Sequence, residues 1–396
     1  MKKTLFSLFL FVIAACVGNE HSGAGTKSDT GAVWQTGRVV DLDKECAIPL
    51  FDLVDSIEVV QLETNNQCLI SWIAKVLFCG DRYYTLDVLR QTVFCFDRNG
   101  RFIRKISGQG RGPKEYVNME DIAIDPYNDQ LLLVDGWGSV LCFDLEGNYI
   151  TTFEIPEAGA INEVHVLDSD RWLFVSLYEE PMLYFSKKEG RIVERLYERY
   201  VFQGGAMPVF RTYSYNDSIY FSPLFSNELL NMSDSRQQVA FSWDFGAKNN
   251  QPKQIKKLLQ ELNDLRKQSE SAYTRGRDFF REGVSLRDTY LNYYIRYTRE
   301  SSRYIMAILE YKNDYMHVIY DKQARKTVVF RETQEGIRWS GSRPFMYNQD
   351  LVIAYDIDGV QAKRYANEIF SPAQLQIVES HTLDDNPFLV VYHLKK

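Results

Sequence analysis

The sequence contains one unit twice in succession, and this repeat constrains the fold more than any other feature. The two copies are offset by about 47 residues and match at three clear points: Asp87 with Asp135, Cys95 with Cys142, and Gly100 with Gly147. Each copy consists of short stretches in which apolar and polar residues alternate, a pattern typical of β-strands. A unit of this size built from four short strands indicates one blade of a β-propeller, a ring of small sheets around a channel.

The rest of the chain supplies strands for six such blades. Further units are predicted over 161–196, 210–245 and 290–331, and a sixth unit over 344–394 contains only three strands. A period-2 strand at Ile57–Leu62 precedes the first blade and belongs to none. We expect it to complete the sixth blade, because an open ring would leave two exposed sheet edges. The predicted fold is therefore all-β, a six-bladed β-propeller over 38–396.

An amphipathic helix is predicted within this propeller, as an insertion at about 251–275 between the fourth and fifth blades. Pro252 stands at an allowed first-turn position, and apolar residues follow at helical spacing: Ile255, Leu258, Leu259, Leu262 and Leu265. Charged residues occupy the opposite face. We expect the helix to pack on the rim as a connector; a cap over one mouth of the channel is the alternative.

The N-terminus predicts export and a lipid anchor. Two lysines, an apolar run at 5–13 and two alanines precede Cys16. This order is typical of a bacterial lipoprotein signal peptide, after which the cysteine is acylated and becomes the mature N-terminus. An ordinary signal peptide or a short membrane helix is the alternative, although the run is too short to span a bilayer comfortably. We expect removal of residues 1–15, a flexible tether at 16–37, and a place in the outer membrane of the cell envelope, with the bilayer as partner through Cys16.

Composition excludes several classes of protein. The net charge is −7 and no long basic run occurs, so nucleic acid is not an expected partner. Five cysteines remain besides Cys16, an odd number without a Cys-x-x-Cys pair, which argues against a full disulfide framework and a zinc ribbon. The five histidines are scattered, and no hydrolase elbow or nucleotide-binding loop occurs. We therefore predict neither a metal site nor a cofactor.

Several segments resemble a known group of proteins. The loop at 108–116 reads Gly-Gln-Gly-Arg-Gly-Pro-Lys-Glu-Tyr, and with Asp121–Asp125 it resembles an NHL-type repeat. Together with the N-terminal motif, Leu53–Glu63 and Asn386–Tyr392, it makes the whole chain similar to the six-bladed β-propeller lipoproteins of gut Bacteroidetes. The loop departs from that family's usual Gly-Gln-Gly-Pro-Gly-Glu-Tyr, since Arg111 replaces the first proline. The resemblance implies the fold and export, but little about biochemical role.

Two loops between blades are candidate binding segments. The loop at 108–116 carries charged and aromatic residues on a glycine-rich backbone: Arg111, Lys114, Glu115 and Tyr116. A loop of this kind leads from an outer strand to the next inner strand, at a mouth of the channel. The segment at 198–205 is the nearest equivalent and offers Arg199 and Tyr200. Arg and Tyr are favoured anchors for ligands; the alternative is a structural joint whose charges pair with neighbouring blades.

Five tryptophans fall near strand ends in different blades: Trp72, Trp137, Trp172, Trp243 and Trp339. If exposed on one face, they would form a stacking surface for sugar rings or aromatic peptides, and Trp137 is a candidate for this role. If buried between blades, they belong to the core, which is their commoner fate.

Acidic residues leave an enzymatic alternative open. Asp87 and Asp135 end equivalent second strands, and Asp121 lies near an inner strand; carboxylates there could bind a metal, but their repetition favours a role in capping turns. We therefore predict a membrane-anchored binding protein of the cell envelope whose ligand is a glycan or a protein. The alternatives are a metal-dependent hydrolase or lyase that uses channel carboxylates, and a structural subunit of an envelope complex.

Overall fold

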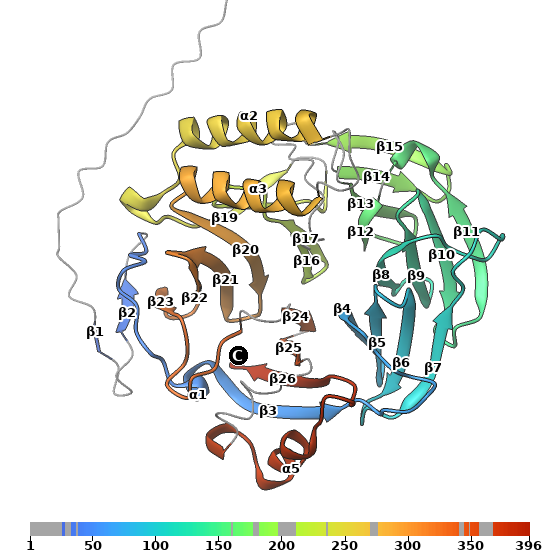
Figure 1. The fold of residues 1–396 in the computed structure, drawn as a ribbon, viewed down its shortest axis with the longest axis horizontal. Helices are drawn as coiled ribbons and strands as arrows, with labels where there is room; N and C mark the ends of the chain where they lie inside the picture. The colour runs from blue at the N-terminus through green and yellow to red at the C-terminus, as the bar shows by residue number, and fades with distance from the viewer. Residues whose placement is uncertain are drawn as a thin grey trace, which may run out of the picture.

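The structure is a computed structural model, and it describes all residues except 1–25, 28–32, 37–38, 160, 177–181, 197–210, 235–236, 270–275, 340–343, 348 and 356–366. Six sheets stand in a ring around a central channel (Figure 1), which confirms the predicted six-bladed β-propeller. In each blade the first strand faces the channel and the last lies outermost. Neighbouring strands of a blade are antiparallel.

The first four blades follow one another along the chain as the repeat predicts. Blade one holds β4 Ile73–Cys79, β5 Arg82–Asp87, β6 Thr92–Asp97 and β7 Phe102–Ser107. Blade two holds β8 Met119–Asp125, β9 Gln130–Asp135, β10 Ser139–Asp144 and β11 Tyr149–Glu154. Blade three holds β12 Ile161–Val166, β13 Arg171–Ser176, β14 Met182–Ser186 and β15 Arg191–Leu196. Blade four holds β16 Thr212–Tyr215, β17 Ser218–Phe221, β18 Glu228–Asn231 and β19 Gln238–Ser242.

The sixth blade closes the ring with the strand expected from the sequence. Its strands are β24 Pro344–Tyr347, β25 Asp350–Tyr355, β26 Phe388–Leu394 and β3 Val54–Gln61. The N-terminal β3 pairs antiparallel with the C-terminal β26, from Phe388 opposite Gln61 to Leu394 opposite Val54. The two ends of the propeller are thus joined by hydrogen bonds within one sheet.

Blade five is larger than the sequence predicts. Its four strands are β20 Tyr293–Glu300, β21 Tyr304–Tyr311, β22 Asp314–Asp321 and β23 Lys326–Phe330. Two strands from the N-terminal segment, β2 Val33–Thr36 and β1 Thr26–Lys27, extend this sheet at its outer edge, and β2 pairs with β23. Part of the segment predicted as a flexible tether at 16–37 therefore lies along blade five.

The helical insertion is confirmed but is longer than predicted. It holds two helices, α2 Pro252–Ser269 and α3 Gly276–Tyr290, where the sequence predicted one helix and placed Tyr290 at the start of a strand. Leu258 and Leu262 of α2 pack with Phe225 and Leu291 at the junction of blades four and five, so α2 is a connector on the rim. The short α1 Leu50–Leu53 and the α5 helix Pro372–Ser380 were not predicted. None of the described helices is long and apolar enough to cross a membrane.

The hydrophobic core lies between blades and not at one centre. One cluster joins the facing sides of blades two and three through Trp172, Phe174 and Leu132, all fully buried. A comparable cluster joins blade six to blade one through Leu389 and Phe96. Each blade buries an apolar surface only against its neighbours, so closure by β3 stabilises the whole ring.

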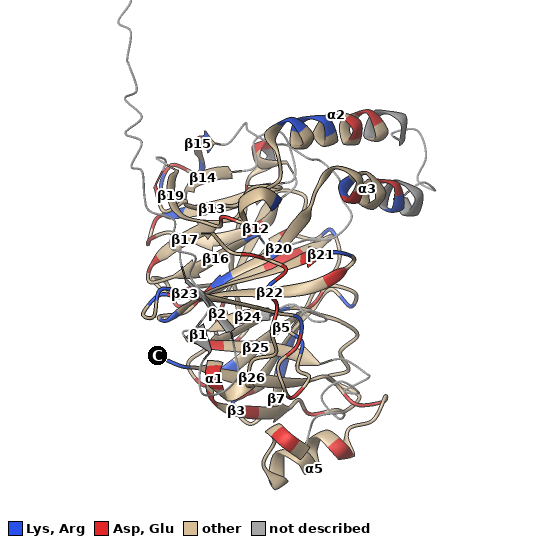
Figure 2. Cartoon of the chain, turned by 90° about the vertical axis from the view of Figure 1, so that its left-hand side faces the viewer, with Lys and Arg blue, Asp and Glu red and all other residues tan. Residues whose placement is uncertain are grey.

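Because every blade has the same strand order, its connections sort onto two faces. Connections between first and second strands, and between third and fourth strands, lie on what we call the hairpin face. Connections between second and third strands, and from each outer strand to the next inner strand, lie on the opposite face, which we call the crossover face. The α2–α3 insertion is such a crossover, and Figure 2 shows its helices projecting from one side of the ring.

Candidate functional site

Among the described residues, a hollow lies at the mouth of the channel on the hairpin face. It is a cavity of about 770 Å³, lined by residues from the inner strands of all six blades. The lining comes from the later half of these strands and from the hairpins that follow them, such as Gly80–Asp81 after β4 and Pro126–Tyr127 after β8. The volume falls in the range typical of small-molecule sites.

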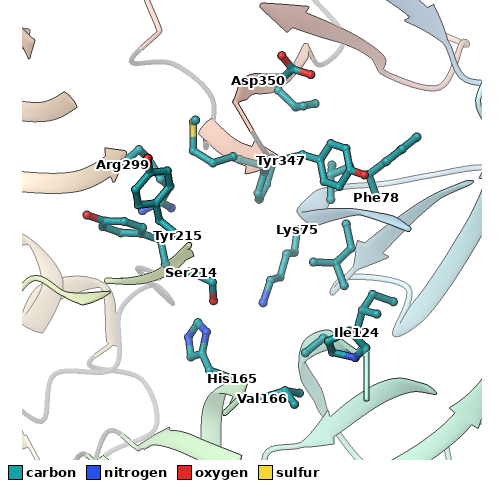
Figure 3. A pocket seen from close by; sticks show the side chains of 18 of the residues that line it. Lys75, Phe78, Ile124, His165, Val166, Ser214, Tyr215, Arg299, Tyr347 and Asp350 are labelled. Atoms are coloured by element: carbon teal, nitrogen blue, oxygen red, sulfur yellow. The ribbon is translucent and has the colours of Figure 1, made fainter. Parts of the chain in front are cut away.

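Aromatic side chains gather around this mouth. Phe78, Tyr127, Tyr215 and Tyr347 stand at or beside the hairpins of four different blades. Tyr127 is 52% exposed, and the rings of Phe78 and Tyr347 pack edge to face with centroids 4.5 Å apart. Figure 3 shows Phe78, Tyr215 and Tyr347 around the opening. The rim thus offers flat apolar surfaces to a ligand that enters the channel.

The deeper part of the cavity is polar, and its central cation is held by a buried carboxylate. Lys75 Nζ lies 2.8 Å from Asp121 Oδ1, while the second oxygen of Asp121 accepts a hydrogen bond from Val164 N at 3.0 Å. Asp121 is fully buried, and burial raises the pKa of its carboxyl, a shift that the Lys75 ammonium opposes. In Figure 3 Lys75 extends into the cavity toward His165 and Ser214.

His165 belongs to a chain of three buried side chains from blades three and four. Its Nε2 lies 2.5 Å from Thr212 Oγ1, and the Thr212 hydroxyl donates a short hydrogen bond to Glu163 Oε2. A carboxylate can only accept, so the Thr212 proton points to Glu163 and the imidazole must donate from Nε2. In a neutral imidazole with this tautomer, Nδ1 is the acceptor nitrogen. Glu163 also accepts from Arg211 N at 3.2 Å, which fixes the chain in place.

The opposite wall of the cavity carries a second histidine between two acids. His393 Nδ1 lies 2.9 Å from Asp350 Oδ1, and its Nε2 lies 3.8 Å from Glu58 Oε2. These groups come from strands of blade six and add both donors and acceptors to the lining. Arg299 reaches the cavity from blade five, where its guanidinium lies 5.6 Å from the ring centre of Tyr297.

The predicted binding loop at 108–116 lies on the crossover face, and none of its residues lines the cavity. Tyr116 is 1% exposed, and its hydroxyl donates to Gln91 O at 2.5 Å and accepts from Gly108 N at 3.0 Å. Glu115 accepts from Gly112 N at 2.7 Å, within the loop itself. The Tyr116 side chain therefore joins the loop to blade one, whereas Glu115 bonds within the loop and not to a neighbouring blade.

Other residues of the candidate set remain at the surface of the crossover face. Arg111 is exposed, and Lys114 Nζ lies 5.1 Å from the ring centre of Tyr149. Trp137 is 75% exposed in the hairpin between β9 and β10. Arg199 and Tyr200 lie outside the described residues, as does Cys16.

The remaining tryptophans divide between core and surface. Trp172, Trp243 and Trp339 are buried and belong to clusters between blades, whereas Trp72 is 41% exposed. The five do not form one stacking surface. Only Trp72 and Trp137 are exposed among them.

The repeated carboxylates cap turns, as their repetition suggested. Asp87 accepts from Ser71 N, Leu89 N and Arg90 N, and Asp135 accepts from Val117 N and Trp137 N. Among the described residues, no group of three or more His, Cys, Asp or Glu side chains is placed to hold a metal ion. Of the three acids considered for catalysis, Asp121 lies beside the cavity, but it is engaged by Lys75.

Reasoning from the sequence missed the cavity because its residues are far apart along the chain. Lys75, Ile124, His165 and Ser214 each come from a different blade and meet only when the ring closes. One signal was present in the sequence: an aromatic residue recurs at the first hairpin of several blades, as at Phe78, Tyr127 and Tyr347.

The closed ring and the cavity in its channel define the molecule as a six-bladed β-propeller protein. Comparison by sequence identifies the family within this class: the chain belongs to the family described as domain of unknown function DUF4934, whose model matches residues 38–393. No curated protein matches the sequence.

A solved structure shows the same fold at low sequence identity. A Bacteroides fragilis protein named as an exported protein superposes with a TM-score of 0.72 at 15% identity, covering 89% of this chain and 98% of that one. A member of the DUF4221 family from Bacteroides vulgatus gives a TM-score of 0.43 at 10% identity, covering 93% of this chain and 99% of that one. The first match supports the propeller fold; the second is too distant to add to it.

Proposed function

We propose that this protein is an exported, lipid-anchored propeller that binds a carbohydrate in the channel cavity on its hairpin face. The observation that carries the proposal is the combination of an aromatic rim with a polar floor in one concave site. Sugar rings have apolar faces that stack on aromatic side chains and hydroxyls that need both donors and acceptors. Lys75 supplies donors, and Glu163, His165 and Asp350 supply acceptors within the same cavity.

The shape of the site favours a carbohydrate over a folded protein as ligand. Protein partners usually meet broad surfaces, whereas small ligands are enclosed in cavities of this size. Charges of both signs line the cavity, so we expect a neutral or weakly charged oligosaccharide. The proposals of export and anchoring rest on the N-terminal motif that ends at Cys16. The structural neighbour from Bacteroides fragilis is named as an exported protein, which agrees with export.

A thermal-shift screen followed by calorimetry tests the binding proposal. The chain from residue 17 contains the whole ring, and we expect at least one oligosaccharide from a broad panel to stabilise it. Tyr127→Ala should then weaken binding about 2- to 13-fold, because one stacked aromatic contributes about 0.5–1.5 kcal/mol. Trp137→Ala is the matched control, since Trp137 is a similarly exposed aromatic on the other face.

The outcomes separate the competing functions. Stabilisation by peptides but not by sugars would make the ligand a protein segment. Stabilisation by divalent cations alone would favour the metal-dependent hydrolase or lyase. Anchoring is tested separately: Cys16→Ala should move the protein from the membrane fraction to a soluble fraction, and retention in the membrane would contradict it.

A further inference from the structure

The channel cavity reaches farther outward along blade six than along blades two, three and five. In those three blades, the described residues of the lining come from the inner strand and the hairpin after it. Blade six contributes from all of its strands: Phe345 of β24, Val352 of β25, Val391 of β26 and Glu58 of the outermost strand β3. The cavity therefore continues from the channel mouth toward the outside of the ring beside blade six.

The register of blade six places these residues in one row across the sheet. Phe345 stands opposite Val352, and Val352 stands opposite Val391. Val391 in turn stands opposite Glu58. Residues directly opposite each other in neighbouring strands lie on the same face of the sheet. With a spacing of about 4.8 Å between neighbouring strands, the row is roughly 14 Å long.

A second row on the same face is polar. Tyr347 stands opposite Asp350, and Asp350 stands opposite His393. His393 Nδ1 lies 2.9 Å from Asp350 Oδ1, and its Nε2 lies 3.8 Å from Glu58 Oε2. The side chains of Asp350, His393 and Glu58 remain 26, 35 and 38% exposed. Hydrogen-bonding groups thus follow one another along blade six from the channel toward the outermost strand.

The facing wall belongs to blade one and is aromatic. Phe78 stands opposite Tyr83 with ring centroids 4.8 Å apart, and Phe78 also contacts Tyr347 of blade six (Figure 3). Burial raises the pKa of Tyr83 to about 12; the charge of Glu58 adds to this shift and that of Arg98 opposes it, so both groups lie near the ring. Arg98 is exposed, and no hydrogen bond or ion pair within the part of the chain that the structure describes engages its guanidinium.

We propose that this extension of the cavity binds consecutive units of a linear oligosaccharide whose end occupies the channel mouth. We call the extension the radial arm; it is lined by Glu58, Tyr83, Arg98, Asp350 and His393. The inference rests on the proposed carbohydrate site and extends it from one sugar to a chain.

The shape and chemistry of the radial arm fit such a chain. Its length of roughly 14 Å exceeds that of one sugar ring, and along blades two, three and five the lining offers no comparable path. An aromatic wall facing a polar wall suits a ribbon of sugars, which has apolar ring faces and hydroxyl edges. Hydroxyls can donate to Glu58 and Asp350 and accept from Arg98.

Calorimetry with oligosaccharides of defined length tests the radial arm. The probes are neutral cello-, xylo-, manno- and malto-oligosaccharides of two to six units, each titrated into the chain 17–396. We expect the affinity for at least one series to rise about tenfold or more between two units and five, since each hydrogen bond to a charged group adds to binding. The sixth unit should add little, because it lies beyond the arm.

Variants of the arm and of the mouth should differ in how their effect depends on length. Glu58→Ala combined with Arg98→Ala should lower the affinity for the pentasaccharide about tenfold and that for the disaccharide less than about twofold. Tyr127→Ala, in the mouth on blade two, should lower both by the same factor. Trp137→Ala on the crossover face should change neither. All of these side chains are largely exposed, so each variant should keep the melting temperature of the parent.

The outcomes separate the radial arm from the function on which it rests. Absence of binding by every series would overturn both the carbohydrate site and the arm. Binding that does not strengthen beyond the disaccharide would overturn the arm alone and leave the site in the channel mouth. An equal loss at both lengths in the Glu58→Ala and Arg98→Ala variant would do the same, whereas a loss confined to the longer chains supports the arm.

Discussion

Replacing Gly100 with alanine tests how blade one is joined to the strand that closes the ring. Gly100 has φ +81° in the hairpin between β6 and β7, and a Cβ added there would lie 2.0 Å from Gln61 O of β3. Its own carbonyl accepts from Glu63 N at 2.8 Å. The obstacle is backbone, which cannot turn aside as a side chain can.

The repeat supplies a matched control in Gly147, the equivalent residue of blade two. It has nearly the same φ, +79°, but an added Cβ would meet only side-chain atoms of Arg104 and Ile106 at 3.4 Å or beyond. Alanine at either position bears the cost of a left-handed backbone, about 1–2 kcal/mol. Only Gly100→Ala adds overpacking, typically about 1–3 kcal/mol, so its total loss should be about 2–5 kcal/mol.

Urea unfolding of the two variants, followed by tryptophan fluorescence, measures the difference. We expect Gly100→Ala to lower the unfolding midpoint clearly more than Gly147→Ala, with the slope of the transition unchanged. Equal losses would mean that the approach of Gly100 to Gln61 does not hold blade one to β3, and the account of ring closure would need revision.

Three further variants test the cavity and the core. Lys75→Met should destabilise the fold by about 3–5 kcal/mol by leaving Asp121 charged and unpaired in the interior, and adding Asp121→Asn should recover most of that loss in urea unfolding. Burial lowers the pKa of His317 to about 4, so the folded state resists protonation of this side chain. The contribution of the neutral imidazole to the free energy of unfolding is therefore complete above pH 6.5, and it falls by about 3 kcal/mol between pH 6.5 and 4. His317→Gln should remove that part of the pH dependence of stability, and an unchanged profile would contradict it. Thr212→Val should weaken carbohydrate binding about fivefold by releasing His165 from its tautomer, with recovery in Thr212→Ser, as measured by calorimetry across pH; equal affinities would show that the chain of hydrogen bonds does not position His165.

The strands were predictable because local rules govern them. Alternation and glycine turns located the strands of blades one and two within a few residues, and the leftover strand at Ile57–Leu62 identified the closing partner of β26. Helix α5 was missed because it falls in the connection within blade six, where no repeat pattern guided the prediction. The addition of β2 to β23 was missed because a Gly- and Ser-rich segment has weak strand propensity, and pairing with an existing edge decides its conformation.

The candidate site was less predictable than the fold. Charged and aromatic composition singled out the loop at 108–116, but composition does not distinguish Tyr116 as a buried brace from Tyr116 as a ligand anchor. That distinction depends on Gln91, which lies in the connection between β5 and β6. Its backbone carbonyl accepts the hydrogen bond that the Tyr116 hydroxyl donates. Trp137 is exposed in a tight hairpin in which the flanking glycines have no side chains to cover it.

The pairing of β3 with β26 also sets an order of events during synthesis. Gln61 is made long before its partner Phe388, so the ring cannot close until the chain through β26 has emerged. Contacts so distant in sequence form slowly, and blades that wait for them expose unpaired edges. For the exported protein proposed here, that delay would keep the polypeptide unfolded enough for translocation until its passage across the membrane is complete.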